Sequence, residues 1–250
     1  MPGIDATVVK FLYRGWKARY RDHKAEILAL TSALQPGDIA VDVGANKGSF
    51  IPSLAKAVAA GKLIAFEPQP YLADYLKGIV AAAGLSNVQV EAQGVSDRSG
   101  SLRLGIPGYG ASSPGASFEE AVMTRESCTL LDVPVCTLDG YFATESRRIG
   151  AIKIDVEGHE LAVLRGAESI MSHHRPLIVC ECENRHLTEY GVEEVLGYFR
   201  SFGYDGYFVQ RGRLRPVAEF NSNQHQRAEG EDYWNRKDYC NNFVMQYVGR

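Results

Sequence analysis

The stretch IAVDVGANKGSF, residues 39–50, decides how the rest of the chain is arranged. Its apolar start, residues 39–41, predicts a buried strand, and the glycine-bearing turn of residues 44–48 follows. A helix is predicted from residue 49 to about residue 60. Glycine lets the backbone approach a ligand, and the start of a helix directs unpaired N–H groups toward it. The order of strand, turn and helix therefore predicts a nucleotide-like binding corner.

The residues of this turn favour one class of ligand. Gly44 and Gly48 do not form the G-x-G-x-x-G dinucleotide fingerprint, because Asn46 occupies the central position between them. Asn is one of the few residues besides glycine that tolerate a left-handed backbone. Asp42 would repel a phosphate and attract a cation. The turn therefore favours S-adenosylmethionine, with its sulfonium and amine, over NAD or ATP; a glycine turn without a ligand is the alternative.

A second acid supports nucleoside binding. The predicted strand of residues 62–66 ends at Glu67, and an acid at the tip of this strand can accept both hydroxyls of an adenosyl ribose. The combination of Glu67 with the glycine turn is more specific than either feature alone; a surface glutamate is the alternative. The tip of the third strand, residues 88–92, leads to Ser96 and Asp97, which are candidates to contact the adenine edge. For Asp97, a polar turn is an equally good interpretation.

Composition limits the class of protein. The chain has 250 residues, of which 45% are hydrophobic and 23% charged, as in an average globular protein with one α/β domain. Its net charge of -3 gives no general attraction to nucleic acid, so we expect no nucleic-acid partner. No apolar run reaches transmembrane length and no signal peptide is visible, so we expect a cytoplasmic protein. Five cysteines without a CxxC pair argue against a disulfide framework and a zinc site.

The first 24 residues are basic and aromatic. They contain the cations Lys10, Arg14, Lys17, Arg19, Arg21 and Lys24 and the aromatic residues Phe11, Tyr13, Trp16 and Tyr20. We favour a solvated helix face on which the stems of the cations cover apolar surface. A helix that closes over the active site, or one that touches a phosphorylated or membrane-bound acceptor, is the alternative. A second helix is predicted over residues 25–34.

The rest of the chain alternates strands and helices around one loose segment. Residues 100–134 are rich in Gly, Ser and Pro and too long for a simple connection, so we interpret them as a mobile lid or an acceptor-binding insertion. Further strands are predicted over residues 133–138, 151–155, 176–182 and 242–248. Helices are predicted over residues 71–83, 139–148 and 192–202, and another begins at residue 156. A hairpin is predicted over residues 206–217. This order predicts a mostly parallel sheet with an antiparallel strand at its end.

Three stretches, VDVGANKGSF, IAFEPQP and IKIDVEGHELAVLRGA, together resemble the FkbM family of S-adenosylmethionine-dependent methyltransferases. The similarity extends over about residues 36–248. It implies a Rossmann-like class I methyltransferase fold with a seven-stranded, mostly parallel sheet whose last strand is antiparallel. It also implies O-methylation of a hydroxyl on a sugar, glycan or polyketide-type metabolite. We accordingly expect a helical segment over residues 1–35 and a methyltransferase domain over 36–250, with an insertion at about 100–134.

The resemblance also assigns candidate residues. Its cofactor turn matches Asp42, Gly44, Asn46 and Gly48, its ribose acid matches Glu67, and its second signature matches Asp155, Glu157 and His159. In such a sheet, the strand tips at Asp155 and Glu181 flank the ligand. We predict these two acids as catalytic residues that orient the acceptor, and His159 as the general base, since imidazole titrates near neutral pH. The alternatives are a structural His159 at the helix start and, for Lys153, either an ion pair or a catalytic role.

Three further interpretations remain open. Asp155, Glu181 and Asn184 could hold Mg²⁺, which prefers oxygen ligands and would activate a hydroxyl, but we favour a mechanism without metal. A cofactor-binding subunit without catalytic activity and an NAD-dependent oxidoreductase are the alternative functions. The expected partner is a small-molecule or glycan acceptor.

Overall fold

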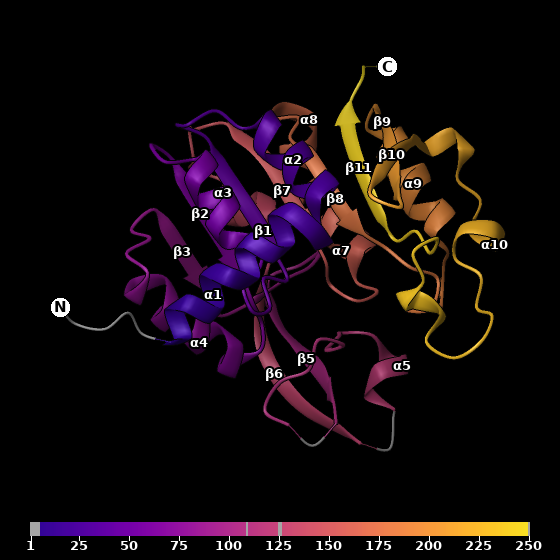
Figure 1. The fold of residues 1–250 in the computed structure, drawn as a ribbon, viewed down its shortest axis with the longest axis horizontal. Helices are drawn as coiled ribbons and strands as arrows, with labels where there is room; N and C mark the ends of the chain where they lie inside the picture. Colours follow the sequence, from indigo (N-terminus) through magenta and orange to yellow (C-terminus); the bar gives the residue numbers. More distant parts are fainter. Residues whose placement is uncertain (1–5, 109, 125–126, 250) are drawn as a thin grey trace.

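The structure is a computed structural model that describes residues 6–108, 110–124 and 127–249. Within these residues, the main sheet has eight strands in the order β10-β9-β11-β8-β7-β1-β2-β3 (Figure 1). The strands are β1 (Ile39–Val43), β2 (Lys62–Phe66), β3 (Val88–Glu91), β7 (Ile149–Ile154), β8 (Leu177–Glu181), β9 (Tyr204–Gln210), β10 (Arg213–Pro216) and β11 (Asn242–Tyr247).

The directions of the strands confirm the mostly parallel sheet. β1 pairs in parallel with β2 and β7, β2 with β3, and β7 with β8. The last strand of the chain, β11, is antiparallel to its neighbours β8 and β9, as predicted. The expected count of seven strands was wrong, because β10 pairs with β9 at the sheet edge. Arg211 and Gly212 join these two strands, and both have the positive φ (50° and 73°) that a two-residue hairpin turn requires.

Alternate residues of the parallel strands face opposite sides of the sheet. In β1, Ile39, Val41 and Val43 enter one hydrophobic cluster, whereas Ala40 enters the other. The neighbouring strand β7 repeats this pattern, with Ile152 and Ile154 on one side and Ala151 on the other. Both faces are therefore covered, which explains why these strands appear as continuous apolar runs in the sequence.

Helices cover both faces of the main sheet (Figure 1). The cluster on one face includes residues of α1 (Ala6–Lys17), the π-helical turn Ala18–Asp22, α2 (Lys24–Ala33), α3 (Ile51–Ala57) and α4 (Pro70–Ala82). The cluster on the other face includes residues of α6 (Leu138–Tyr141), α7 (Glu160–Arg165), α8 (Glu168–His173) and α9 (Val192–Ser201). Among the residues described, none of these helices has the length and apolar character needed to cross a bilayer.

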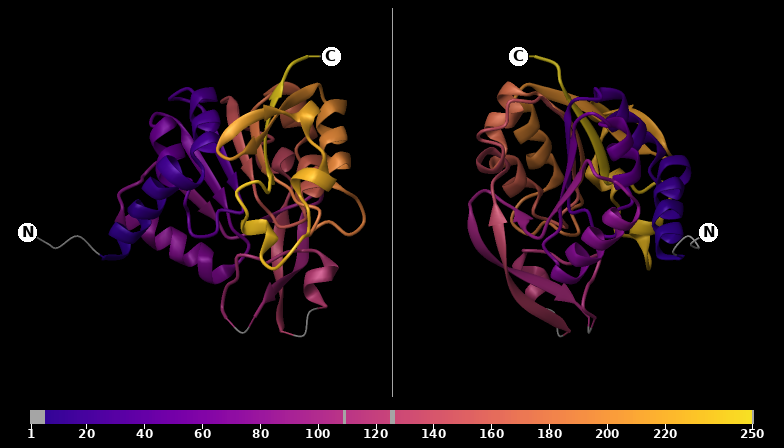
Figure 2. Two further views of the ribbon diagram at one scale, coloured as in Figure 1. Left: turned by 45° about the vertical axis from the view of Figure 1, so that its right-hand side comes forward. Right: turned by 90° about the vertical axis from the view of Figure 1, so that its left-hand side faces the viewer.

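The segment predicted as a loose insertion, residues 100–134, forms most of an arm with regular structure that spans residues 94–136. The arm contains β4 (Gly94–Val95), β5 (Gly100–Pro107), α5 (Glu120–Met123) and β6 (Cys128–Cys136). β5 and β6 pair antiparallel over their whole length, and Leu104, Ile106 and Val133 form a small core of their own. Figure 2 shows from two sides that this hairpin extends away from the main sheet. Its Gly, Ser and Pro residues concealed the strand pattern, and its stretches at residues 109 and 125–126 lie outside the described part.

Several predicted boundaries differ from those observed. The first helix after β1 is α3, shorter than expected, and α6 ends after one turn rather than reaching residue 148. α7 begins only at Glu160, because Glu157 and Gly158 before it have positive φ values of 53° and 104°, which no α-helix contains. Between β10 and β11 the chain forms three short helices, Val217–Glu219, α10 (Ser222–His225) and Tyr233–Asn235.

The amino-terminal helix packs directly against the glycine turn. Phe11 has no exposed surface, and a Cβ atom placed on Gly48 would lie 3.0 Å from its ring. Arg14 Nη1 donates a hydrogen bond of 2.9 Å to the carbonyl oxygen of Lys47 in the same turn. α1 therefore supports the start of α3, a role that its basic and aromatic composition did not reveal.

We expect Phe11→Ala to lower the free energy of unfolding by about 3–5 kcal/mol, because it leaves a cavity against the glycine turn. Tyr13→Ala on the opposite face of α1 is the matched control, since Tyr13 is 59% exposed and its loss should change stability by about 0.5 kcal/mol or less. Urea unfolding of both variants measures the difference. Equal stability of the two variants would contradict the assigned packing.

Candidate active site

A cavity opens at the carboxyl ends of β1, β2, β7 and β8, where ligands bind in sheets of this kind. Its empty volume is about 860 Å³ including the open mouth, a size typical of small-molecule sites. Four acidic residues form part of its wall: Glu67, Asp155, Glu157 and Glu181. The cavity is therefore strongly acidic, and it complements a ligand that carries positive charge.

The predicted site residues separate into two groups. Five of them line the cavity: Gly44, Asn46, Glu67, Asp155 and Glu181. Five others, all within the described chain, do not belong to that lining: Asp42, Gly48, Ser96, Asp97 and His159. The strand tips are thus placed in the cavity as expected, whereas the residues beside them have other contacts.

Glu67 is held rigidly at the tip of β2. Its Oε2 accepts a hydrogen bond of 2.7 Å from the backbone N–H of Asn46, and its Oε1 accepts one of 2.9 Å from the N–H of Gln69. Burial raises the pKa of Glu67, while these two N–H donors oppose that shift. A carboxylate has about four lone-pair sites, so two remain for hydroxyl donors in the cavity.

The backbone of the glycine turn is left-handed at Asn46, as the sequence predicted, and at both glycines. Gly44, Asn46 and Gly48 have positive φ values of 77°, 48° and 75°. A Cβ atom on Gly44 would lie 1.8 Å from the carbonyl oxygen of Asp155, and one on Gly48 would touch Leu76, at 2.9 Å. Both glycines therefore allow close packing of the protein on itself, and Gly44 also lines the cavity.

Lys153 lies below this turn in a network of buried charge. Its Nζ donates a hydrogen bond of 2.8 Å to the carbonyl oxygen of Gly44, and it lies 3.1 Å from Asp155 Oδ2 and 3.3 Å from Asp42 Oδ1. Burial lowers the pKa of Lys153, but Asp155 and Asp42 outweigh it and the net shift is upward. Of the two interpretations of Lys153, the structure shows the ion pair.

Asp42 is consequently a buried partner of Lys153. It is completely buried, and apart from the ion pair with Lys153 neither of its carboxylate oxygens has a hydrogen-bond partner among the described residues. Burial raises the pKa of Asp42, and Lys153 counteracts that shift. The acid predicted to attract a cationic ligand therefore attracts a lysine of the protein instead.

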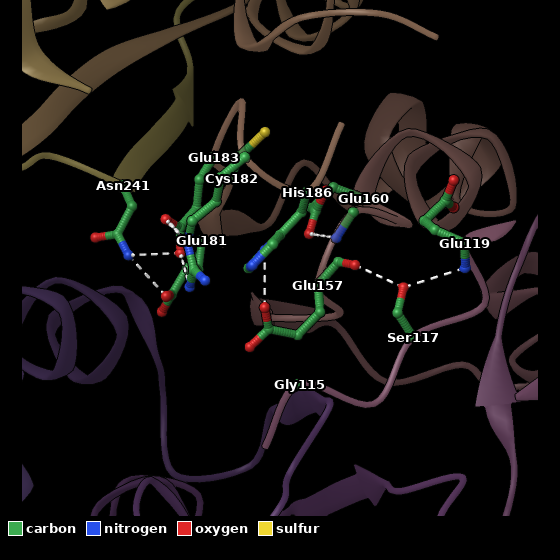
Figure 3. A network of polar contacts seen from close by, with 12 residues as sticks. Gly115, Ser117, Glu119, Glu157, Glu160, Glu181, Cys182, Glu183, His186 and Asn241 are labelled. Atoms are coloured by element: carbon green, nitrogen blue, oxygen red, sulfur yellow. Dashed lines mark hydrogen bonds and ion pairs between the residues drawn. The ribbon is translucent and has the colours of Figure 1, made fainter. Parts of the chain in front are cut away.

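Glu181 is the acid with the most perturbed environment in the cavity wall. Its Oε1 accepts a hydrogen bond of 2.7 Å from Asn241 Nδ2, which also lies 3.3 Å from Glu183 Oε1 (Figure 3). Burial raises the pKa of Glu181 well above its usual range, and the charges of Asp155 and Glu183 add to the effect. Burial and the neighbouring acids therefore favour the protonated form of Glu181 more than in a solvent-exposed glutamate.

The signature loop connects the cavity to the arm. The backbone oxygen of Glu157 accepts a hydrogen bond of 2.6 Å from Ser117 Oγ, and its carboxylate Oε2 lies 2.7 Å from His186 Nδ1 (Figure 3). Gly158 has no space for a side chain, because a Cβ atom would lie 2.7 Å from the carbonyl oxygen of His186. The unusual conformation at these two residues thus serves to hold the arm beside the cavity.

His159 joins the same connection. Its Nδ1 lies 3.0 Å from Glu119 Oε1 of the arm, and its Nε2 lies 2.9 Å from Ser96 Oγ. Phe118 packs against the imidazole, with 5.1 Å between ring centroids. Both ring nitrogens therefore have partners in the protein. This geometry favours the structural role of His159, which the sequence had left as the alternative to a general base.

Ser96 and Asp97 lie behind the cavity wall rather than in it. Ser96 is fully buried, and its Oγ donates a hydrogen bond of 3.2 Å to Asp97 Oδ1. The preceding residues Gly94 and Val95 line the cavity instead. The residues that line the cavity therefore lie two positions before the predicted ones along the chain.

The residues considered for Mg²⁺ have other partners. Asn184 Oδ1 accepts a hydrogen bond of 2.9 Å from the N–H of Val192, at the start of α9. Glu181 is bonded to Asn241, as described above. In the chain as described, no group of three His, Cys, Asp or Glu side chains is arranged to hold a metal ion.

Other residues of the wall were missed by the sequence interpretation. His23, between the π-helical turn and α2, lines the cavity, and so do Leu104, Pro114, Ala116, Ser117 and Phe118 of the arm. Gln69 Oε1 accepts a hydrogen bond of 2.8 Å from the N–H of Ser113, which connects the tip of β2 to the arm. The composition of residues 100–134 suggested a mobile lid or an acceptor-binding insertion, and it did not indicate which residues would face the cavity.

Comparison with known proteins identifies the family to which the chain belongs. The sequence pattern of the methyltransferase FkbM domain matches residues 42–205, which is more than half of the chain. The chain belongs to the FkbM methyltransferase family. Methyltransferase sdnD of Sordaria araneosa is 31% identical over 191 residues, which cover 66% of this chain and 71% of that protein.

One solved structure with a TM-score above 0.5 supports the class I methyltransferase fold of this FkbM methyltransferase. The crystal structure of methyltransferase FkbM from Methylobacillus flagellatus KT has a TM-score of 0.54 at 14% identity. The match covers 97% of this chain and 55% of that one, so the chain spans little more than half of its length. An rRNA methylase from Streptococcus thermophilus has a TM-score of 0.47 at 14% identity, over 90% of this chain and 95% of that one.

The family and the fold imply S-adenosylmethionine as the methyl donor, and the cavity residues of this FkbM methyltransferase fit it. Glu67 has lone pairs available for the two ribose hydroxyls. The acidic wall suits a ligand with a sulfonium and an amine. Phe66 and Val95 add apolar atoms to the cavity wall, which suits an adenine ring.

A buried acid beneath the signature loop makes stability depend on pH. Glu160 is 2% exposed; its Oε1 accepts a hydrogen bond of 2.9 Å from the N–H of Gly158, and its Oε2 has no partner among the described residues. Burial is the main cause that raises the pKa of Glu160 from 4.5 to about 8. Between these values the folded state holds a proton that the unfolded state has released. The contribution of Glu160 to the free energy of unfolding therefore falls as pH rises.

We expect Glu160→Gln to remove this loss, because glutamine keeps the acceptor for Gly158 and cannot ionise. The stability of the variant relative to the natural protein should rise between pH 5 and 8, by up to about 1.4 kcal/mol per pH unit. Urea unfolding at several pH values measures the difference, with Glu120→Gln on the exposed side of α5 as the control. A difference that is constant across this range would contradict a protonated Glu160.

Proposed function

We propose that this methyltransferase transfers the methyl group of S-adenosylmethionine to a hydroxyl of a small-molecule acceptor, such as a sugar, glycan or polyketide-type metabolite. The observation that carries the proposal is the presence of two different acids in one cavity. Glu67, with both oxygens fixed by backbone N–H groups, suits a ribose. Glu181, with its raised pKa, suits the proton of an acceptor hydroxyl.

When bound, S-adenosylmethionine supplies an electrophilic methyl group on its sulfonium. The protein must position the acceptor in line with that group and remove the proton of the hydroxyl. Glu181 accepts this proton at Oε2, while Asn241 fixes Oε1. Asp155, held by Lys153, orients the acceptor through a hydrogen bond. In this proposal His159 positions the arm and does not meet the substrate.

The arm forms the side of the cavity that we assign to the acceptor. Ser117 and Phe118 face the cavity from the arm, and the hydrogen bonds from Ser117 to Glu157 and from Ser113 to Gln69 fix that wall. Leu104, Pro114 and Ala116 add apolar surface on this side. The acceptor class would then be decided by the arm rather than by the strand tips.

The direct test uses purified protein with S-adenosylmethionine labelled in its methyl group and a panel of hydroxylated metabolites. We expect S-adenosylhomocysteine and a product whose label is a methoxy carbon by NMR. Label on nitrogen or carbon, or on ribosomal RNA offered in the same assay, would contradict the proposal. Binding of the cofactor without turnover on any acceptor would favour the interpretation as a subunit without catalytic activity.

We expect Glu67→Gln to weaken both S-adenosylmethionine and S-adenosylhomocysteine by about 1–3 kcal/mol, because the charge that accepts the ribose hydroxyls is lost. Isothermal titration calorimetry measures both ligands. Glu91→Gln at the tip of β3 is the matched control, since Glu91 does not line the cavity. Unchanged affinities in a folded Glu67→Gln variant would remove Glu67 from the cofactor site.

The pH dependence of the rate distinguishes the possible bases. If Glu181 removes the proton, kcat should rise with pH through its ionisation, and Glu181→Gln should lower kcat by about 10²–10⁴-fold and abolish that rise. His159→Ala should lower kcat and leave the rise in place, because its effect acts through the arm. Loss of the pH dependence in His159→Ala would make histidine the base. Loss of turnover on chelation, restored by Mg²⁺, would instead support a metal-assisted mechanism.

A further inference from the structure

The amino-terminal helical segment carries apolar residues on two faces. Val8, Phe11, Gly15 and Ala18 are buried against the body of the protein. A second set recurs at helical spacing on the exposed side, with exposed fractions from 46% at Leu12 to 59% at Tyr13; we call it the aromatic face, and it consists of Val9, Leu12, Tyr13, Trp16 and Tyr20. A helix on a protein surface usually has one apolar face, so the second one indicates a partner.

The rings of this face are already ordered. Tyr13 stacks on Trp16 with 5.9 Å between ring centroids and 19° between ring planes, and Trp16 packs on Tyr20 at 5.8 Å. Beside them lies a shallow hollow whose rim includes Arg19 and Lys56. The rings need little further ordering to bind a partner, so the entropy cost of docking is low.

The charge around the aromatic face is positive. Residues 6–21 contain five cations and no carboxylate, whereas the whole chain has a net charge of -3. Arg14 binds the glycine turn, and Lys17 and Arg21 pair with Asp22. Within the described chain, Lys10, Arg19 and Lys56 have no carboxylate within ion-pair distance. These three cations therefore remain available for an anionic partner.

We propose that the aromatic face docks this protein on the surface of a bilayer that contains anionic phospholipids. Tyr and Trp place an apolar ring in the acyl boundary and a polar group in the headgroup layer, and neighbouring Lys and Arg attract anionic headgroups. A second copy of the chain is disfavoured, because it would bring two sets of cations together. Single-stranded nucleic acid is disfavoured, because Tyr13 and Trp16 cover part of each other's ring faces, on which bases would stack.

Docking would bring the bilayer surface near the cavity. His23 follows the π-helical turn directly and lies in the cavity wall. Arg14 on α1 holds the turn that contains Gly44 and Asn46. The same helical segment thus carries the aromatic face and contacts the active-site cavity. The proposal concerns binding, and it stands or falls independently of the reaction assigned above.

The test uses the fluorescence of Trp16 in a Trp234→Phe background, which removes the other tryptophan of the chain. We expect a blue shift and co-sedimentation with vesicles of phosphatidylcholine mixed with phosphatidylglycerol, and neither with vesicles of phosphatidylcholine alone. High salt should weaken the binding. The double variant Lys10→Glu/Arg19→Glu should reduce partitioning by at least about tenfold, since each cation near an anionic surface contributes roughly fivefold. Leu12→Ser/Tyr20→Ser should reduce it by a similar factor.

Tyr71→Ser is the matched control, because Tyr71 is equally exposed on α4 and lies outside the aromatic face. It should leave vesicle binding unchanged. Equal binding to both kinds of vesicle, no binding to either, or full binding by the two double variants would each overturn the proposal. So would light scattering that shows a dimer which dissociates in Leu12→Ser/Tyr20→Ser, or binding to single-stranded RNA without binding to vesicles.

Discussion

The rest of the structure depends on the buried ammonium of Lys153. It connects β7, on which it lies, to Asp42 of β1 and to the carbonyl oxygen of Gly44, where the turn leaves the sheet. The same Nζ holds Asp155, one of the acids in the cavity wall. Removing one member of such a buried group costs about 3–5 kcal/mol, because the remaining charges lose their partner. The position of the turn and the position of the cavity acid are therefore fixed by one interaction.

The signature stretch IKIDVEGHE acquires a physical explanation from this arrangement. Lys153 and Asp155 belong to the ion network below the cavity, and the residues that follow them belong to the connection with the arm. Glu157 takes a positive φ that costs of order 1–3 kcal/mol for a residue other than glycine, and its carbonyl is thereby directed to Ser117. The stretch thus unites the floor of the cavity with the wall that we assign to the acceptor.

The sequence was informative where the structure is local and uninformative where it depends on distant partners. The strands, the turn at Gly44 and the position of Glu67 follow from patterns within a few residues, because apolar periodicity and backbone preference act at that range. The place of His159 depends on Glu119 and Ser96, 40 and 63 residues away. The packing of Phe11 on the glycine turn depends on a similarly distant contact. No local pattern contains these partners, so the sequence alone could not place His159 beside the arm or Phe11 against the turn.

The acids of the cavity couple the charge of a bound ligand to the protonation of Glu181. Glu181 has a raised pKa because it is buried and because Asp155 and Glu183 add negative charge near it. A cationic ligand in the same cavity would offset that charge and lower the pKa of Glu181. In the proposed function, binding of the methyl donor would therefore favour the deprotonated form of Glu181, which is the form that can accept the proton of the acceptor. The base would thus become available when the methyl donor is bound. Cofactor binding would in this way be linked to activation of the acceptor hydroxyl.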